Sequence, residues 1–463
     1  MKNQLPQGKL TLDELKEKIA NNEVDTILVV FPDLYGRLLG KRIPAPFFLD
    51  SIAQDGMHAC DYLLTVDMEM DVVDGYKFAN WEKGYGDFHC APDFNTLRQL
   101  TWLDKSALII CDLETEPGHR PVAVAPRAML KQQLARLSET GFSAKGASEL
   151  EHYIFKETYE SAKVKNFENL ETFGWYIEDY HMLQATKEEP LNAAIRRHME
   201  RSGIPIESSK GEWGPGQHEI NFRYSDALEM ADRHVIYKQG SKEIAIAQGL
   251  SVTFMAKWRS DLAGSSMHLH LSLWDEEGRR NLFPGERKMG PLAVSDLFRW
   301  FLGGWMAHAR AMTPFYAPYP TSYKRYISQS WAPTSIAWSY DNRTAGFRVV
   351  GSGNSLRIES RIGGADANPY LAFAAAIAAG LDGIENKIEP PDIFEGDVYA
   401  AANLPKVPAT LREATDELEQ SAMLRAAFGD DVVEHYVHFF RTEQRKFDEA
   451  VTTWERERYF ERA

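Results

Sequence analysis

Apolar residues along the chain follow two spacings, one typical of helices and one typical of strands. Leu12, Leu15 and Ile19 share one helical face, and Thr11 with Glu14 forms a capping box at its start. The helical spacing predicts further helices over 126–141, 191–202, 227–248, 294–312, 370–386, 410–424 and 431–457. The alternating spacing predicts strands over 25–31, 106–113, 149–155, 219–224, 251–256, 268–274, 346–350 and 356–362, with a further basic strand running to residue 44. Because strands and helices follow no βαβ rhythm, we expect an α+β protein with a mainly antiparallel sheet.

Two regions of the chain differ in character. Residues 45–105 are rich in Asp, Gly and aromatic residues and are expected to be irregular. Segment 116–121 contains two prolines and a glycine, which is typical of a boundary. We therefore expect a small α+β domain over 1–119 and a larger domain over 120–463.

Composition restricts the class of protein. The chain has 463 residues, a net charge of −15 and only three cysteines. That charge disfavours binding to duplex nucleic acid or to an anionic membrane. The N-terminus has no apolar stretch typical of a signal peptide, and the longest apolar run, 371–381, is too short to span a bilayer. We expect a soluble, cytoplasmic protein with a buried, alanine-rich helix in that run.

Carboxylates and histidines recur one residue apart in the expected strands, as in Glu149-Leu150-Glu151 and His268-Leu269-His270. Residues i and i+2 of a strand point to the same face. A single such pair is usually a solvated strand face. Several pairs turned inward would repel one another unless cations lay between them. A set of five glutamates and one histidine suits Mg²⁺ or Mn²⁺ better than Zn²⁺; the predicted metal ligands are Glu149, Glu151, Glu212, Glu219, His268 and Glu359.

A basic segment lies close to these residues in the sequence. Span 321–365 carries a local charge of +4 from two acidic residues (Asp341, Glu359) and six basic ones: Lys324, Arg325, Arg343, Arg348, Arg357 and Arg361. This could be a surface patch. Arginine also binds carboxylate and phosphate through two donors, and an anion site beside a metal site suits phosphoryl transfer. The chain has no P-loop, so metal and arginine would hold the phosphates.

Several motifs together resemble glutamine synthetase. They are segments 253–257 (TFMAK), 264–270 (GSSMHLH), 342–345 (NRTA), 357–359 (RIE) and 365–371 (ADANPYL). Their order and spacing hold from about residue 36 to about residue 386. The resemblance implies an N-terminal β-grasp domain and a C-terminal antiparallel, barrel-like catalytic domain. It also implies a ring-shaped homo-oligomer, a dodecamer of two stacked hexamers, with active sites between subunits.

The resemblance also assigns roles to residues. One metal would be held by Glu151, Glu212 and Glu219, and the other by Glu149, His268 and Glu359. Glutamate would be bound by Gly264, Arg325, Arg361 and Tyr176. ATP would be bound by His270, Arg343 and Arg348 at the phosphates, where Arg343 also offsets charge on the transferred group, and by Tyr224, Ser272 and Arg357 at the nucleotide.

The chain departs from glutamine synthetases where they bind ammonium. They carry an acidic residue six positions after the arginine that Arg325 matches, and Trp331 stands there in this chain. Their Asp-Gly-Ser-Ser motif is missing too, with Asp61 and Asp67 as candidate replacements. An aromatic face suits a larger amine with a carbon body, as in the γ-glutamyl amine ligases of the superfamily. Alternatively, Trp331 fills a gap in a glutamine-forming enzyme.

These features predict an ATP-dependent ligase that uses Mg²⁺ or Mn²⁺. It would join the γ-carboxylate of L-glutamate to an organic amine through γ-glutamyl phosphate. Glu212, Asp61 or Asp67 would be the base that deprotonates an alkylamine, whereas an arylamine needs none. The sequence leaves the amine open among polyamines, ethanolamine, alkylamines and arylamines. A true glutamine synthetase and a catalytically silent homologue are the alternatives.

Overall fold

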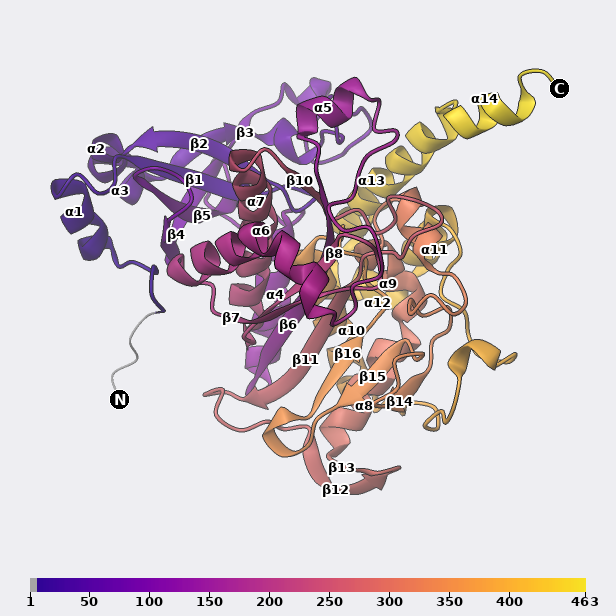
Figure 1. Ribbon diagram of the computed structural model, residues 1–463. Coiled ribbons are helices and arrows are strands. Elements are labelled where there is room, and N and C mark those ends of the chain that lie inside the picture. The colour runs from indigo at the N-terminus through magenta and orange to yellow at the C-terminus, as the bar shows by residue number, and fades with distance from the viewer. Residues whose placement is uncertain (1–5) are drawn as a thin grey trace.

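The computed structural model describes residues 6–463, and its N-terminal part contains a five-stranded sheet (Figure 1). Its strand order is β2 (Leu38–Pro44), β1 (Thr26–Pro32), β5 (Ser106–Thr115), β4 (Asp87–Leu100) and β3 (Met57–Cys60). β1 and β5 are parallel, and the other neighbours are antiparallel. The capping box predicted at Thr11 and Glu14 starts α1 (Leu12–Ala20).

The expectation that residues 45–105 are irregular is wrong. This stretch contains β3, the 14-residue β4 and the short helices α2 (Ala45–Phe47) and α3 (Ala53–Asp55). The register of β4 against β5 shifts between Asp93 and Arg98. A bulge of this kind breaks the two-residue alternation of apolar side chains, and Pro92 interrupts it as well. The strand therefore has no regular pattern in the sequence.

A second, nine-stranded sheet forms a nearly closed barrel. Its main path is β14 (Trp338–Tyr340), β15 (Phe347–Val350), β16 (Arg357–Ser360), β11 (Met267–Asp275), β6 (Phe142–Phe155), β8 (Gln217–Phe222) and β7 (Ile206–Gly211). β9 (Ser225–Asp226) and β10 (Ser251–Thr253) also pair with β6, and β12 (Pro284–Met289) and β13 (Leu292–Val294) form a separate hairpin. Every pairing in the nine-stranded sheet is antiparallel except that of β14 with β15. The predicted α+β class with a mainly antiparallel sheet is confirmed.

Helices pack around this sheet. They are α4 (Pro126–Glu139), α5 (Tyr159–Val164), α6 (Met182–Arg201), α7 (Ala227–Ala247), α8 (Asp296–Ala307), α9 (Ala309–Tyr316), α10 (Pro369–Asn386), α11 (Leu411–Gln420), α12 (Ala422–Phe428), α13 (Asp430–Glu449) and α14 (Thr453–Tyr459). α10 is buried along almost its whole length, as its alanine-rich run predicts. The helix expected over 294–312 is divided at His308 into α8 and α9. α6 starts nine residues earlier than expected because the helix continues through Pro190. Within residues 6–463, no helix combines the length and apolar character needed to cross a membrane.

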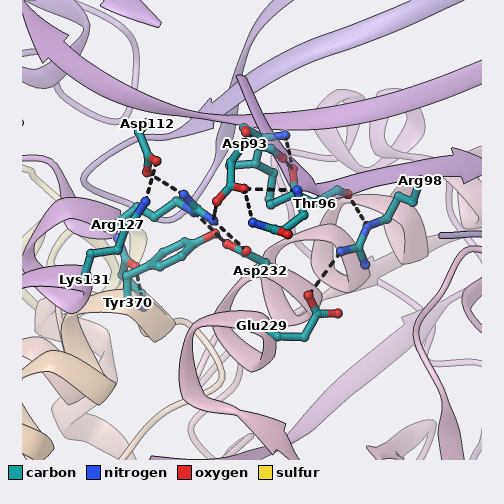
Figure 2. A network of polar contacts seen from close by, with 12 residues as sticks. Asp93, Thr96, Arg98, Asp112, Arg127, Lys131, Glu229, Asp232 and Tyr370 are labelled. Carbon is teal, nitrogen blue, oxygen red and sulfur yellow. Dashed lines mark hydrogen bonds and ion pairs between the residues drawn. The ribbon is translucent and has the colours of Figure 1, made fainter. Parts of the chain in front are cut away.

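A buried arginine joins the N-terminal sheet to helices that pack around the second sheet (Figure 2). Arg127 lies in the first turn of α4, and its side chain is only 3% exposed. Its guanidinium donates to Asp232 of α7 at 3.0 Å and to Asp93 of β4 at 2.8 Å, and it also pairs with Asp112 of β5. Tyr370 of α10 donates its hydroxyl to Asp232 at 2.7 Å. One cation therefore holds two strands of the N-terminal sheet, β4 and β5, against two helices of the larger part of the chain, α7 and α10.

Replacement of Arg127 with alanine should lower the free energy of unfolding by about 3–5 kcal/mol, because it leaves buried carboxylates without their cation. Lys131→Ala is the matched control, since Lys131 sits on the same helix and pairs with the same Asp112 while 43% exposed. Its expected cost is below about 1 kcal/mol. Denaturant titration measures both values, and equal losses would contradict the central role of Arg127.

Candidate active site

The barrel-like sheet holds one large cavity of about 980 Å³. Its wall contains all six predicted metal ligands: Glu149, Glu151, Glu212, Glu219, His268 and Glu359. The strand register explains why they meet. His268 lies opposite Glu149, Glu219 lies opposite Glu151, and Glu359 lies opposite His270 on neighbouring antiparallel strands. Directly opposed residues share a face of the sheet, so the one-apart pairs of the sequence become one polar cluster.

Glu151, Glu212 and Glu219 form the first donor group, with one carboxylate oxygen of each within 4.8 Å of the others. The Ser266 backbone N–H donates to Glu151 at 2.9 Å. Burial raises the pKa of Glu151 to about 8, and the nearby Glu212 carboxylate adds to this shift. Burial, together with Glu149, Glu212 and Glu151, also raises the pKa of Glu219 well above its ordinary value. Lys210 pairs with Glu212, but Glu151 and Glu219 resist ionisation together unless a further cation compensates them.

The second donor group is centred on Glu149. His268 Nδ1 lies 3.2 Å from Glu149 Oε2 and 3.7 Å from Glu359 Oε1, and His270 Nε2 lies 3.0 Å from Glu149 Oε1. Although burial opposes its ionisation, the pKa of Glu149 lies well below the ordinary value because His270 and His268 flank it. Burial also opposes the ionisation of Glu359, but Arg361 and His268 lower its pKa to about 2. Burial and the charge of Arg361 lower the pKa of His268 to about 4, so its ring is neutral near pH 7 and can act as a ligand.

The two groups together fit divalent cations. They supply five carboxylates and one imidazole, and the buried His268 Nε2 has no hydrogen-bond partner among the described residues. Oxygen-rich sets of this kind suit Mg²⁺ or Mn²⁺, whereas zinc sites usually contain more Cys or His.

Arginines border this cluster on one side. Arg325 is buried, and it donates to Ser266 Oγ at 3.2 Å and to the Gly363 carbonyl at 2.8 Å. Arg361 donates to Glu359 at 2.7 Å. The Nε atoms of both arginines are buried without a partner within the described part of the chain, so each has an N–H group available for an anion.

Gly264 lies against Arg325, as the predicted glutamate site requires. A Cβ at this position would lie 2.5 Å from Arg325 Cγ and 2.7 Å from the Ala256 carbonyl oxygen. Only glycine lets the backbone pass this close to the arginine.

The residues predicted to bind ATP divide into those that line the cavity and those that lie outside its wall. Arg343 and Arg348 line the cavity, and Arg348 donates to Glu359 at 2.9 Å. Arg357 Nε donates to His270 Nδ1 at 3.2 Å, which directs the other ring nitrogen of His270 toward Glu149.

Tyr224 and Ser272 lie outside the wall of this cavity, around Trp274. The Tyr224 ring is stacked on Trp274 with centroids 6.3 Å apart, and Ser272 Oγ accepts a hydrogen bond from Trp274 Nε1 at 2.9 Å. Lys145 Nζ lies 4.2 Å from the centre of the Trp274 ring. Trp274 is buried, but the Tyr224 ring is 57% exposed and can stack against a planar base.

Two tryptophans form an aromatic wall on the cavity, and the sequence predicted only one of them. Trp331 is 47% exposed, and its ring centroid lies 6.2 Å from that of Trp213. Both residues line the cavity. Trp331 has a φ of +63°, an uncommon conformation for a bulky residue. Trp213 could have been found because it directly follows the predicted ligand Glu212.

Asp61, Asp67 and Tyr176 are further predicted site residues that do not line this cavity. Asp61 lies beside the N-terminal sheet, in the 3₁₀ turn that follows β3. Asp67 accepts hydrogen bonds from two backbone N–H groups and pairs with Lys446, so its carboxylate is already engaged. The Tyr176 ring faces His181, with centroids 5.7 Å apart.

A buried triad next to the cavity was missed by the sequence analysis. His218 Nε2 lies 3.1 Å from Glu178 Oε2 and also contacts Glu188, and all three side chains are buried. The Gly216 N–H donates to Glu178 at 2.7 Å. The triad ties the segment before α6 to β8, and its only signal in the sequence is that His218 precedes the predicted ligand Glu219.

Known proteins resemble this chain over nearly its full length. A 453-residue alignment, 98% of this chain and 96% of the relative, is 47% identical to the γ-glutamylethanolamide synthetase GlnA4 of Streptomyces coelicolor. Glutamate–isopropylamine ligase of a Pseudomonas species is 35% identical over 98% of this chain and 99% of its own. Glutamine synthetase of Thermotoga maritima is 32% identical over 97% of this chain and 99% of its own. A solved structure of GmaS with ADP superposes with a TM-score of 0.84 at 29% identity, covering 96% of this chain and 99% of that one.

The family assignment follows from these matches. Residues 123–459 match the glutamine synthetase catalytic domain. The expected resemblance to glutamine synthetases, and among them to the γ-glutamyl amine ligases, is confirmed. With its carboxylate cluster, bordering arginines and barrel-like sheet, the chain belongs to the glutamine synthetase family.

Proposed function

We propose that this protein is an ATP-dependent ligase that joins the γ-carboxylate of L-glutamate to an organic amine. One observation carries the proposal: the cavity and its border combine a carboxylate and histidine cluster and partly unpaired arginines with an aromatic wall that offers apolar packing to an amine with a carbon body, which ammonium lacks. The names of two relatives, a γ-glutamylethanolamide synthetase and a glutamate–isopropylamine ligase, support the same reaction class.

Glutamate binding is assigned to the buried arginines. The α-carboxylate would pair with Arg325 beside Gly264, and the γ-carboxylate would lie near Arg361, between Arg325 and the carboxylate cluster. Arginine's planar fork matches a carboxylate with two parallel hydrogen bonds. Their unpartnered Nε atoms support this role.

The reaction has two steps. A γ-carboxylate oxygen attacks the terminal phosphorus of ATP, and the bond to the ADP oxygen breaks to give γ-glutamyl phosphate and ADP. The amine nitrogen then attacks the γ-carbonyl carbon, phosphate leaves, and the amide forms with loss of one proton from nitrogen. Arg343 and Arg348 would offset charge on the transferred phosphoryl group. Mg²⁺ or Mn²⁺ bound by the six predicted ligands would supply further charge neutralisation.

The amine would bind at the aromatic wall of Trp331 and Trp213. Its carbon body would pack on the rings, and a protonated amine would gain a cation–π contact. An alkylamine must lose a proton before it attacks. Glu212, which directly precedes Trp213, is the candidate base that lines this cavity. The other two candidates, Asp61 and Asp67, do not line it.

We also infer a wider organisation for the enzyme. A β-grasp domain over 1–119 and a catalytic domain over 120–463 are supported by a first sheet that ends at Thr115 and a family match that begins at residue 123. A ring-shaped homo-oligomer of two hexamers in the cytoplasm is carried over from the family resemblance alone.

An acceptor screen tests the proposed reaction. With glutamate, ATP and Mg²⁺, phosphate release should depend on an added amine such as ethanolamine, isopropylamine, a polyamine or aniline. Mass spectrometry should detect the matching γ-glutamyl amide. Efficient release with low ammonium would favour a glutamine synthetase, and no release with any acceptor would favour a silent homologue.

Trp331→Glu should shift acceptor preference toward ammonium by about tenfold or more in kcat/KM, because it restores an anionic group where a small cation must bind. The readout is the ratio of kcat/KM for ammonium to that for the best amine. Trp454→Glu, a 60% exposed tryptophan in α14, is the control and should leave the ratio unchanged. An unchanged ratio in Trp331→Glu would refute the role of the aromatic wall.

Metal binding should strengthen as pH rises. The pKa of Glu151 near 8 means that its proton must leave before a cation binds, so apparent Mn²⁺ affinity should rise by about tenfold per pH unit below pH 8. Calorimetry in buffers of different ionisation enthalpy measures the released protons.

The folding stability of the metal-free protein should instead fall as pH rises. A folded pKa raised from its ordinary 4.5 to about 8 gives stability that is present at low pH and lost as pH rises through 8. Glu151→Gln should weaken both dependences, whereas Glu385→Gln, at a 57% exposed site, should change neither. Mn²⁺ affinity that is flat between pH 6 and 8 would contradict this account.

A further inference from the structure

A second group of metal-binding side chains lies on the N-terminal sheet. β3, β4 and β5 align His58 opposite His89, and His89 opposite Glu114, so these residues form one row across a face of the sheet. His119, from the turn after β5, reaches the end of this row. None of the four lines the large cavity.

Three donor atoms of this group form a nearly equilateral triangle. His89 Nδ1 lies 3.0 Å from Glu114 Oε2, His119 Nδ1 lies 3.1 Å from the same oxygen, and the two nitrogens are 3.2 Å apart. Ligands at about 2.0–2.1 Å from a tetrahedral Zn²⁺ lie about 3.4 Å from one another. The triangle is slightly smaller than this, so a small outward movement would place one ion among all three atoms.

With a neutral His89 ring, hydrogen bonds alone leave lone pairs facing one another in this triangle. His89 Nε2 lies 2.8 Å from the Asp55 carbonyl oxygen, which only accepts, so Nε2 carries the proton of the neutral ring. His89 Nδ1 is then a bare acceptor, and it faces a carboxylate and a second ring nitrogen. His89 is only 9% exposed, whereas the His119 side chain is 57% exposed, so the triangle is open to solvent on the His119 side, where a water ligand could enter. A cation in the triangle satisfies all three lone pairs at once.

The surroundings fix the two rings where a metal needs them. The Asp55 carbonyl accepts from His89 Nε2 and so fixes the tautomer, as carbonyls behind metal-bound histidines do. Gly56 makes room for the ring, since a Cβ there would lie 2.2 Å from His89 Nε2. Two backbone hydrogen bonds hold the turn that carries His119. The His119 N–H donates to the Thr115 carbonyl at 3.0 Å, and the Thr115 N–H donates to the Arg120 carbonyl at 2.8 Å.

We propose that His89 Nδ1, His119 Nδ1 and the Glu114 carboxylate bind a Zn²⁺ ion, with a water at the fourth position. Two imidazoles and one carboxylate suit zinc, in contrast to the oxygen-rich cavity that suits Mg²⁺ or Mn²⁺. The ion ties the turn over 115–120, which leads from the N-terminal sheet toward α4, to strands β4 and β5. This site is independent of the proposed ligase reaction.

Zinc stoichiometry tests the proposal directly. Purified full-length protein is stripped with chelator, loaded with Zn²⁺, dialysed against excess Mg²⁺ and analysed by mass spectrometry for bound metal. Wild type should retain one more equivalent of Zn²⁺ per chain than His119→Gln or His89→Gln. Any Zn²⁺ in the large cavity cancels in this difference, because the variants leave that cavity intact.

Controls separate coordination from folding. His119 has a 57% exposed side chain, so its replacement leaves the core intact, and Zn²⁺ should raise the melting temperature more in wild type than in His119→Gln. His308→Gln is the matched control, since His308 contacts a single carboxylate, Asp382, at 2.7 Å; it should keep the full Zn²⁺ content. Co²⁺ should give the intense visible absorption of a tetrahedral site in wild type and lose it in His119→Gln. Equal Zn²⁺ content in wild type and both variants would overturn the proposal.

Discussion

Mutual repulsion among buried carboxylates is the constraint on which the rest of the site depends. Glu151, Glu212 and Glu219 lie close together away from water, and the pKa of each is raised above the ordinary value, with burial as the main cause. Such a cluster destabilises the fold unless a proton or a metal compensates it. Beside it, Glu149 and Glu359 are compensated by histidines and arginines and stay ionised. Lys210 already pairs with Glu212, so the cavity combines Glu151 and Glu219, which await a cation, with carboxylates that are already paired.

The architecture concentrates these charges through strand register. Antiparallel pairing of β6 with β8 and β11, and of β11 with β16, aligns donors from segments more than 200 residues apart in sequence. The framework behind them is held by another set of buried charges. Arg127 compensates three aspartates and fixes the N-terminal sheet against α4 and α7. Buried charge therefore serves two roles here: it is paired internally where the N-terminal sheet meets α4 and α7 and left partly unpaired where a ligand must bind.

Much of this site could be predicted because it rests on local patterns. The one-apart spacing of Glu149 with Glu151 indicated a shared strand face, and the family motifs supplied its partners. The contacts of Arg127 could not be predicted, since they join residues up to 105 positions apart whose proximity depends on the complete fold. Trp213 was missed although it directly follows the predicted ligand Glu212, because its approach to Trp331 depends on the fold. The triangle of His89, Glu114 and His119 was missed for a definite reason: β4 carries a bulge and reads as irregular, so its register with β5 was not foreseen.

The most direct test of the central claim is a crystal structure with Mn²⁺ and a non-hydrolysable ATP analogue, read by anomalous scattering at the manganese edge. The account predicts two ions in the cavity, one among Glu151, Glu212 and Glu219 and the other among Glu149, His268 and Glu359, with the triphosphate bridging them. A cavity without manganese, or nucleotide bound away from these six side chains, would contradict it.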